Sequence, residues 1–163
     1  PYILHPTGFG VVAVDESDAV QGYLIGTTDT VAFARWFVTD WWPSVSSERV
    51  ALTPADESLL RAGADPDRML VSCVDAYPAH LHIDLLAGAR GAGTGRRLVE
   101  AAVEQLRERG VPGVHLVVGA ANDNAIAFYR RTGFTELPDD RGSVAGESLV
   151  FARRVPARVA DPE

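Results

Sequence analysis

The segment at residues 81–109 constrains the fold most, because three different patterns follow one another there without a break. Residues 81–86 alternate apolar and polar side chains, which predicts a strand. Gly91-Ala-Gly-Thr-Gly95 interrupts the alternation, and an apolar stripe with helical spacing then continues to about Arg109. A strand that passes through a glycine-rich turn into a long amphipathic helix favours an α/β domain.

Further elements are expected on both sides of this segment. Strands are predicted at 11–14, 22–27, 114–118 and 146–155, and helices at 30–41, from Thr53 to Gly63, and from Asn122 or Asp123 through Arg131. Residues 65–73 fit either a short helix or a strand. The tryptophans at 36, 41 and 42 are expected in the core or in a pocket. Residues 1–155 should form one domain, followed by a polar tail at 156–163.

The composition is that of a single globular domain. The chain has 163 residues, of which 47% are hydrophobic, and no apolar run approaches the roughly 20 residues of a membrane span. The first residues lack the basic and apolar regions of a signal peptide. A single cysteine, Cys73, excludes an internal disulfide, and this favours a reducing, cytoplasmic setting.

The charge pattern excludes several functions. A formal net charge of −7 argues against nucleic acid as a partner and favours small cationic molecules. All 15 basic residues are arginine, so neither a Schiff-base lysine nor the lysine of a P-loop can be present. Arginine binds phosphate with two parallel hydrogen bonds, so anion binding remains open.

The glycine-rich turn has the composition of an anion site. Closely spaced glycines let successive backbone N–H groups point into one concavity, and the following helix adds its free N–H groups and positive dipole end. Arg90, Arg96 or Arg97 could add positive charge. A glycine-rich connector without any ligand gives the same pattern, so the glycines alone leave both interpretations open.

A second motif decides between them. Asn122-x-x-Ala125-x-x-Phe128-Tyr129-x-x-x-Gly133-Phe134 follows the next apolar strand. Together with Arg90-x-x-Gly93-x-Gly95, it closely resembles the two cofactor motifs of the GNAT (N-acetyltransferase) superfamily, in the expected order. The resemblance covers residues 78–137 well and 11–30 loosely. Residues 77–86, the Pro1-Tyr2 start and Asp29-Thr30-x-x-Phe33 are similar to bacterial acetyltransferases related to the acetyltransferase-like domain of O-GlcNAcase.

This resemblance implies a particular fold and co-substrate. The fold would be a mixed, mainly antiparallel twisted sheet with helices on both faces, splayed where acetyl-CoA enters. The strand and two helices that precede the first hairpin in the family would be absent from this chain. No metal is expected, because no Cys/His cluster has ligand spacing. The acetyl-CoA-binding positions implied are Leu85, Leu86, Ala87, Arg90, Gly91, Ala92, Gly93, Thr94, Gly95, Arg96, Asn122 and Tyr129.

The catalytic candidates lie on the second motif and on the strand. Tyr129 stands where the superfamily places its general acid. His82 and Asp84, with His80, alternate along the strand and can share one face, so either could handle the proton of the acceptor. The alternative is that these side chains satisfy buried hydrogen bonds. The expected function is acetyl transfer to a small acceptor, an amine being favoured over a protein. The alternative is a pseudo-acetyltransferase that binds without turnover.

Overall fold

The computed structural model describes residues 1–138 and 147–157. Its centre is a six-stranded sheet with the order β1-β2-β3-β4-β6-β5. β3 and β4 run parallel and the other neighbours antiparallel, which confirms the mixed, mainly antiparallel sheet. The strands are β1 (Gly8–Val14), β2 (Val20–Thr27), β3 (Ala79–Leu85), β4 (Gly113–Gly119), β5 (Thr135–Leu137) and β6 (Ser148–Arg154).

The helices begin where the sequence places capping residues. Asp29 caps the first helix by accepting the N–H of Ala32, and Thr53 forms a capping box with Asp56. The predicted helix at 30–41 is continuous but changes from α to π geometry at Phe37. The helices are α1 (Thr30–Trp36), η1 (Phe37–Trp41), α2 (Trp42–Ser46), α3 (Pro54–Ala64), α4 (Thr94–Glu108) and α5 (Asp123–Arg131).

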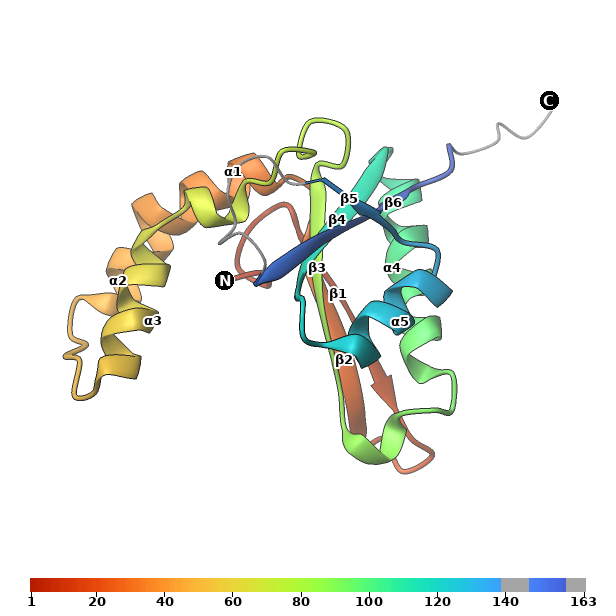
Figure 1. The fold of residues 1–163 in the computed structure, drawn as a ribbon. Coiled ribbons are helices and arrows are strands. Elements are labelled where there is room, and N and C mark those ends of the chain that lie inside the picture. The colour runs from red at the N-terminus through yellow and green to blue at the C-terminus, as the bar shows by residue number, and fades with distance from the viewer. Residues whose placement is uncertain (139–146, 158–163) are drawn as a thin grey trace.

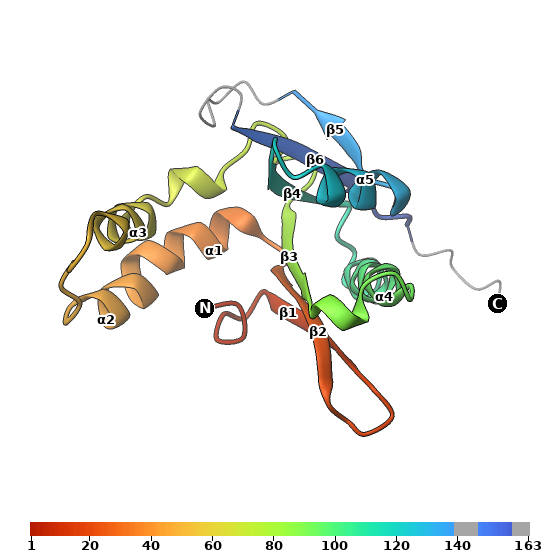
Figure 2. The ribbon, with the colours of Figure 1, turned by 60° about the horizontal axis from the view of Figure 1, so that its bottom comes forward.

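Helices lie on both sides of the sheet. Figures 1 and 2 show α4 and α5 on one side and α1 to α3 extending from the other. Residues 1–7 form turns before the β1–β2 hairpin, and the first three helices follow that hairpin instead of preceding it. The ambiguous segment at 65–73 contains one short 3-10 turn, Asp67–Met69. Residue 146 of the last predicted strand and residues 158–163 of the predicted tail lie outside the described residues.

The main core fills the space between the sheet and α4. The stripe predicted for α4 is buried against Leu24, Leu81 and Phe151 of the strands. On the opposite face, Val71 and Val74 from the loop before β3 pack on Val150 of β6. Because both faces of the central strands are covered at this end, the sheet is held rigidly there.

The sheet opens at its centre. The register of β3 and β4 pairs Ala79 with Val114 and His80 with His115, and no further pair follows among the described residues. The carboxyl-terminal halves of both strands therefore leave backbone groups available between them. The structure also contains β5, which the sequence did not predict, since three residues are too few to show alternation. No helix in the described part of the chain has the length and apolar character needed to span a membrane.

Candidate active site

A cleft of about 840 Å³ lies where β3 and β4 separate. Its walls come from the end of β3, the glycine-rich turn and start of α4, the end of β4, and one face of α5. The first sequence motif ends at Gly95 and the second begins at Asn122, and residues of both line this one cavity. The cleft is lined by Ile83, Asp84, Leu85, Arg90, Gly91, Gly93, Gly95, Arg96, Val117, Val118, Gly119, Asn122, Asn124, Ala125, Phe128, Tyr129 and Arg131.

The turn before α4 requires glycine for backbone reasons. Gly91 and Gly93 have φ angles of 85° and 77°, in the left-handed region that side chains disfavour. Gly93 is the N-cap of α4, a helix of 15 residues, and provides no side-chain cap. The first-turn N–H groups and the positive end of the helix dipole are thus left for a ligand in the cleft.

Gly95 allows a close approach of three elements. A Cβ atom at this position would lie 3.0 Å from the Phe128 ring and 3.1 Å from the Leu85 side chain. These distances are tighter than ordinary packing, so a larger residue would push α4 away from α5 and β3. The missing side chain therefore keeps the walls of the cleft close together at the α4 N-terminus.

The charges along the cleft favour an anion. Arg90, Arg96 and Arg131 line it, against one carboxylate, Asp84. The Arg90 guanidinium donates to the Leu85 carbonyl at 3.4 Å, which places it at the end of β3. A chain with a net charge of −7 thus concentrates positive charge at this site.

Arg97 has a different role. Its guanidinium donates to the Ala92 carbonyl at 3.2 Å and to the Thr94 hydroxyl at 3.1 Å, and it does not line the cleft. Of the predicted positions, Leu86, Ala87, Ala92 and Thr94 also do not contribute to the lining. Thr94 is buried, and Leu86 donates its N–H to the Gln21 carbonyl at 2.9 Å.

α5 presents both predicted and unpredicted residues. The Asn122 side chain lines the cleft and also caps the helix by accepting the N–H of Ala125 at 3.1 Å. Asn124 and Arg131 were missed by the sequence analysis. With Phe128 between them, they follow the i, i+4, i+7 spacing of one helix face, and this spacing could have identified them.

Tyr129 of α5 and Asp84 of β3 line the same cleft. Burial raises the pKa of Tyr129, and the Asp84 carboxylate raises it further. Asp84 is exposed and accepts a hydrogen bond from the Tyr23 hydroxyl at 2.9 Å. Tyr23, on β2 opposite Asp84, is a residue that the sequence analysis did not select. The Tyr129 phenol thus stays protonated at neutral pH.

The histidines share the Asp84 face of β3 but differ in environment. His82 is exposed and does not belong to the lining of the cleft, whereas His80 is only 7% exposed. The Tyr2 hydroxyl lies 2.8 Å from the Nε2 atom of each. Desolvation lowers the pKa of both rings, well below the usual range for His80. At neutral pH both imidazoles are therefore uncharged.

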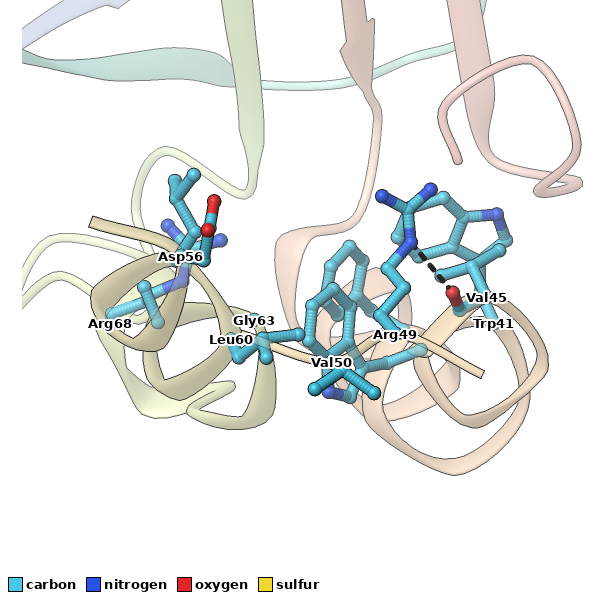
Figure 3. Close-up of a pocket in the computed structure, with 12 residues that line it drawn as sticks. Trp41, Val45, Arg49, Val50, Asp56, Leu60, Gly63 and Arg68 are labelled. Carbon is cyan, nitrogen blue, oxygen red and sulfur yellow. Dashed lines mark hydrogen bonds between the residues drawn. The ribbon is translucent and has the colours of Figure 1, made fainter. Parts of the chain in front are cut away.

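A second cavity, of about 580 Å³, lies among α1 to α3 and is shown in Figure 3. Trp41, Val45 and Arg49 form one wall, and Leu60 and Gly63 of α3 lie on the opposite wall. Trp41 and Trp42 thus belong to a pocket, while Trp36 packs on Phe33 and His5. No cluster of three His, Cys, Asp or Glu side chains suitable for a metal ion occurs within residues 1–138 and 147–157.

Comparison with known sequences finds acetyltransferases over short segments. The chain is 48% identical over 50 residues to a mycothiol acetyltransferase of Beutenbergia cavernae, covering 31% of the chain and 17% of that protein. It is 35% identical over 71 residues to a mycothiol acetyltransferase of Propionibacterium freudenreichii, covering 44% of the chain and 20% of that protein. The chain therefore aligns with about a fifth of the length of these curated relatives.

Solved structures extend the likeness to nearly the whole chain. The structure named SsHAT superposes with a TM-score of 0.79 at 39% identity, over 90% of this chain and 72% of that one. A putative streptothricin acetyltransferase from Bacillus anthracis, in complex with acetyl coenzyme A, has a TM-score of 0.59 at 17% identity, over 95% and 66% of the two chains. The second likeness shows a common fold. Since residues 3–134 also match the acetyltransferase (GNAT) family, the chain belongs to that family.

Proposed function

We propose that the protein binds acetyl-CoA in the cleft between β3 and β4 and transfers its acetyl group to a small amine. One observation carries this proposal: the uncapped N-terminus of α4 and three arginines face the same cavity as Tyr129 and Asp84. An anion site and two acid–base groups within one cleft suit a phosphorylated acyl donor.

The residues of the cleft fit the chemistry of coenzyme A. The N–H groups at the start of α4, with Arg90 and Arg96, would hold a diphosphate. Arg131, at the end of α5, would face a further phosphate. The free edge of β3 offers backbone groups around Leu85 to the amide-containing arm. The co-substrate supplies an acetyl group on a thioester, which an amine can attack without a metal ion.

Tyr129 is proposed to act on the leaving sulfur. Burial and the Asp84 carboxylate raise the pKa of the Tyr129 phenol, which already exceeds that of a thiol, so full proton transfer from the phenol to the sulfur is uphill. This cost is small against the barrier of the reaction, and a hydrogen bond from the phenol stabilises the developing thiolate before the proton moves. The raised pKa of Tyr129 ensures that it carries the proton.

Asp84 and His82 are proposed to act on the acceptor. An alkylamine of pKa about 10 is mostly protonated at neutral pH and must lose a proton before attack. Asp84, exposed at the edge of the cleft, attracts the ammonium group. His82 lies two residues away on the same face of β3, outside the lining of the cleft. Its ring is uncharged, because desolvation lowers its pKa, so it can accept the proton of an amine held by Asp84.

The test measures binding and turnover separately. Calorimetric titration should detect acetyl-CoA binding. Acetyl transfer to members of a panel of small amines should release free CoA, which is measured by separating CoA from acetyl-CoA by chromatography. His82→Gln should lower kcat with little effect on acetyl-CoA affinity. Glu48→Gln, on the loop after α2 and outside the lining of the cleft, serves as a control for a substitution away from the site. Binding without turnover by any amine would indicate a binding module, and absence of binding would refute the proposal altogether.

A further inference from the structure

Four side chains form a continuous hydrogen-bond chain on the face of β3 opposite α4. The Tyr2 hydroxyl bridges the two histidines, at 2.8 Å from the Nε2 atom of each. The Nδ1 atom of His80 lies 2.9 Å from the Thr30 hydroxyl, which is 2.7 Å from the Pro78 carbonyl oxygen. The chain joins the N-terminal turn, the start of α1 and strand β3, and none of its links follows from the two sequence motifs.

The direction of the hydrogen bonds is decided at Thr30. A carbonyl oxygen can only accept, so the Thr30 hydroxyl must donate its single hydrogen to Pro78. The Thr30 oxygen then accepts from His80, which places the His80 hydrogen on Nδ1. An uncharged imidazole carries one ring hydrogen, so Nε2 of His80 is an acceptor. Thr30 is fully buried, so water does not compete for these groups.

The single hydrogen of the Tyr2 hydroxyl likewise fixes the direction of the hydrogen bond to His82. The Tyr2 hydroxyl donates to Nε2 of His80 and must therefore accept from Nε2 of His82. Neutral His82 then has its hydrogen on Nε2 and a lone pair on Nδ1. No residue in the described ranges forms a hydrogen bond with that Nδ1 atom, and the ring is exposed.

We propose that Tyr2 is a positioning residue that holds His82 in its Nε2–H form and leaves Nδ1 as the proton acceptor for the amine. This inference rests on the proposed acetyl transfer. In the proton step, the ammonium N–H bond breaks, the proton binds to the Nδ1 lone pair, and the electron pair stays on the amine nitrogen. The resulting imidazolium keeps its Nε2–H bond to Tyr2 and returns the Nδ1 proton to solvent.

Tyr2 is well suited to hold a fixed position. Its ring stacks on Phe33 with 4.6 Å between centroids and 8° between planes. Burial raises the pKa of Tyr2 to about 12, so its hydroxyl keeps its hydrogen throughout the neutral range. The phenol can therefore donate to one histidine while it accepts from the other.

The chain orients His82 and does not conduct its proton inward. A proton passed through Tyr2 would place a positive charge on His80, which is buried beside His115 and within the field of Arg68. His82 instead faces Asp84, whose charge favours the imidazolium, although Arg68 opposes it. The proton therefore stays on the exposed ring.

The test reads the histidine tautomers by long-range ¹H–¹⁵N NMR of the whole chain, with signals assigned through His82→Gln. In the unaltered protein we expect the hydrogen on Nε2 of His82 and on Nδ1 of His80. Thr30→Val removes the acceptor of His80, whose hydrogen should then move to Nε2 because a buried N–H without an acceptor is costly. Tyr2 would turn towards His82, whose hydrogen should move to Nδ1. Thr30→Ser keeps the hydroxyl and should keep both original tautomers.

Steady-state kinetics of the same variants provides a second test of the proposal. In Thr30→Val, Nε2 of His82 would accept a hydrogen bond from the Tyr2 phenol and Nδ1 would carry the ring hydrogen. Because neither nitrogen of His82 could then accept a proton from the amine, kcat/KM should fall about tenfold or more. Adding Tyr2→Phe removes the phenol that holds the hydrogen of His82 on Nδ1, so it should restore part of the loss, a rescue that a purely structural role does not produce. Tyr77→Phe, which removes a phenol elsewhere, should change neither tautomer.

The outcomes separate the two proposals. An Nδ1–H tautomer of His82 in the unaltered protein, or a double variant slower than Thr30→Val, would overturn the inference even if the protein transfers acetyl groups. The expected tautomers together with no transfer to any amine would support the hydrogen-bond chain and contradict the proposed function. If Thr30→Val does not fold, the spectra of the unaltered protein and of Thr30→Ser still decide the tautomers.

Discussion

Replacing Gly93 tests the anion site at the start of α4 with a matched pair of variants. Gly93→Asp and Gly93→Asn introduce side chains of nearly equal size at a φ of 77°. Aspartate and asparagine tolerate this left-handed conformation better than other residues, so both should lose about 1 kcal/mol of stability. A Cβ atom at this position lies 3.6 Å from Nη1 of Arg97, which is ordinary contact. The pair therefore differs essentially in one negative charge.

That charge should act in opposite directions on folding and on binding. A carboxylate at the N-cap of α4 interacts favourably with the helix dipole, by about 0.3–1 kcal/mol. The same carboxylate repels a bound phosphate. At a separation of roughly 6 Å and an effective dielectric constant of about 20, the repulsion is about 3 kcal/mol. Gly93→Asp should thus bind acetyl-CoA about a hundredfold more weakly than Gly93→Asn, yet unfold at an equal or higher temperature.

Calorimetric titration with acetyl-CoA and thermal unfolding measure the two effects on the same samples. Added salt should narrow the difference in affinity, since part of the repulsion is screened. Equal affinities of the two variants would show that no phosphate group lies near the α4 N-terminus. A Gly93→Asp variant that binds weakly only because it is less stable than Gly93→Asn would contradict the electrostatic explanation.

Other variants test the remaining parts of the site. Tyr129→Phe should lower kcat by about 10²-fold with little change in acetyl-CoA affinity, and an unchanged kcat would show that another group protonates the sulfur. Arg131→Gln should weaken acetyl-CoA binding and reduce its salt dependence, measured by titration at two ionic strengths. Burial lowers the pKa of His80 and His115, so the unfolded chain binds more protons below pH 6.5. Stability to urea should therefore be fully present above pH 6.5 and fall on acidification, by at most about 1.4 kcal/mol per pH unit for each buried histidine, and His115→Gln should flatten this dependence.

Local sequence patterns were sufficient to predict most helices and strands of the fold. Asp29 and Thr53 cap helices because an N-cap needs only a side-chain oxygen within three residues of the N–H groups that it binds. The alternation at 81–86 and the apolar stripe of α4 report burial directly. The π turn at Phe37 and the three-residue strand β5 leave no such periodic signal, because each depends on the surfaces against which it packs.

The two motifs also located the cleft before its shape was known. Arg90, Gly93 and Gly95 and the helix from Asn122 lie on its walls, since the conformation of each motif is local and their order restricts how they can meet. The sequence did not reveal that Arg97 points away from the cleft while Arg131 lines it. Which way an arginine points depends on acceptors, such as the Ala92 carbonyl, that tertiary packing positions.

The polar face of β3 shows most clearly which properties follow from the sequence alone and which depend on the tertiary structure. Alternation by itself determined that His80, His82 and Asp84 share one side of a strand, because successive side chains of a strand point to opposite faces. Only the tertiary structure decided their different environments. The N-terminal turn brings Tyr2 between two histidines about 80 positions away, and α1 brings Thr30 to one of them. Hydrogen-bond direction depends on partners distant in sequence, so the tautomer of His82 is a property of the folded chain and not of its strand.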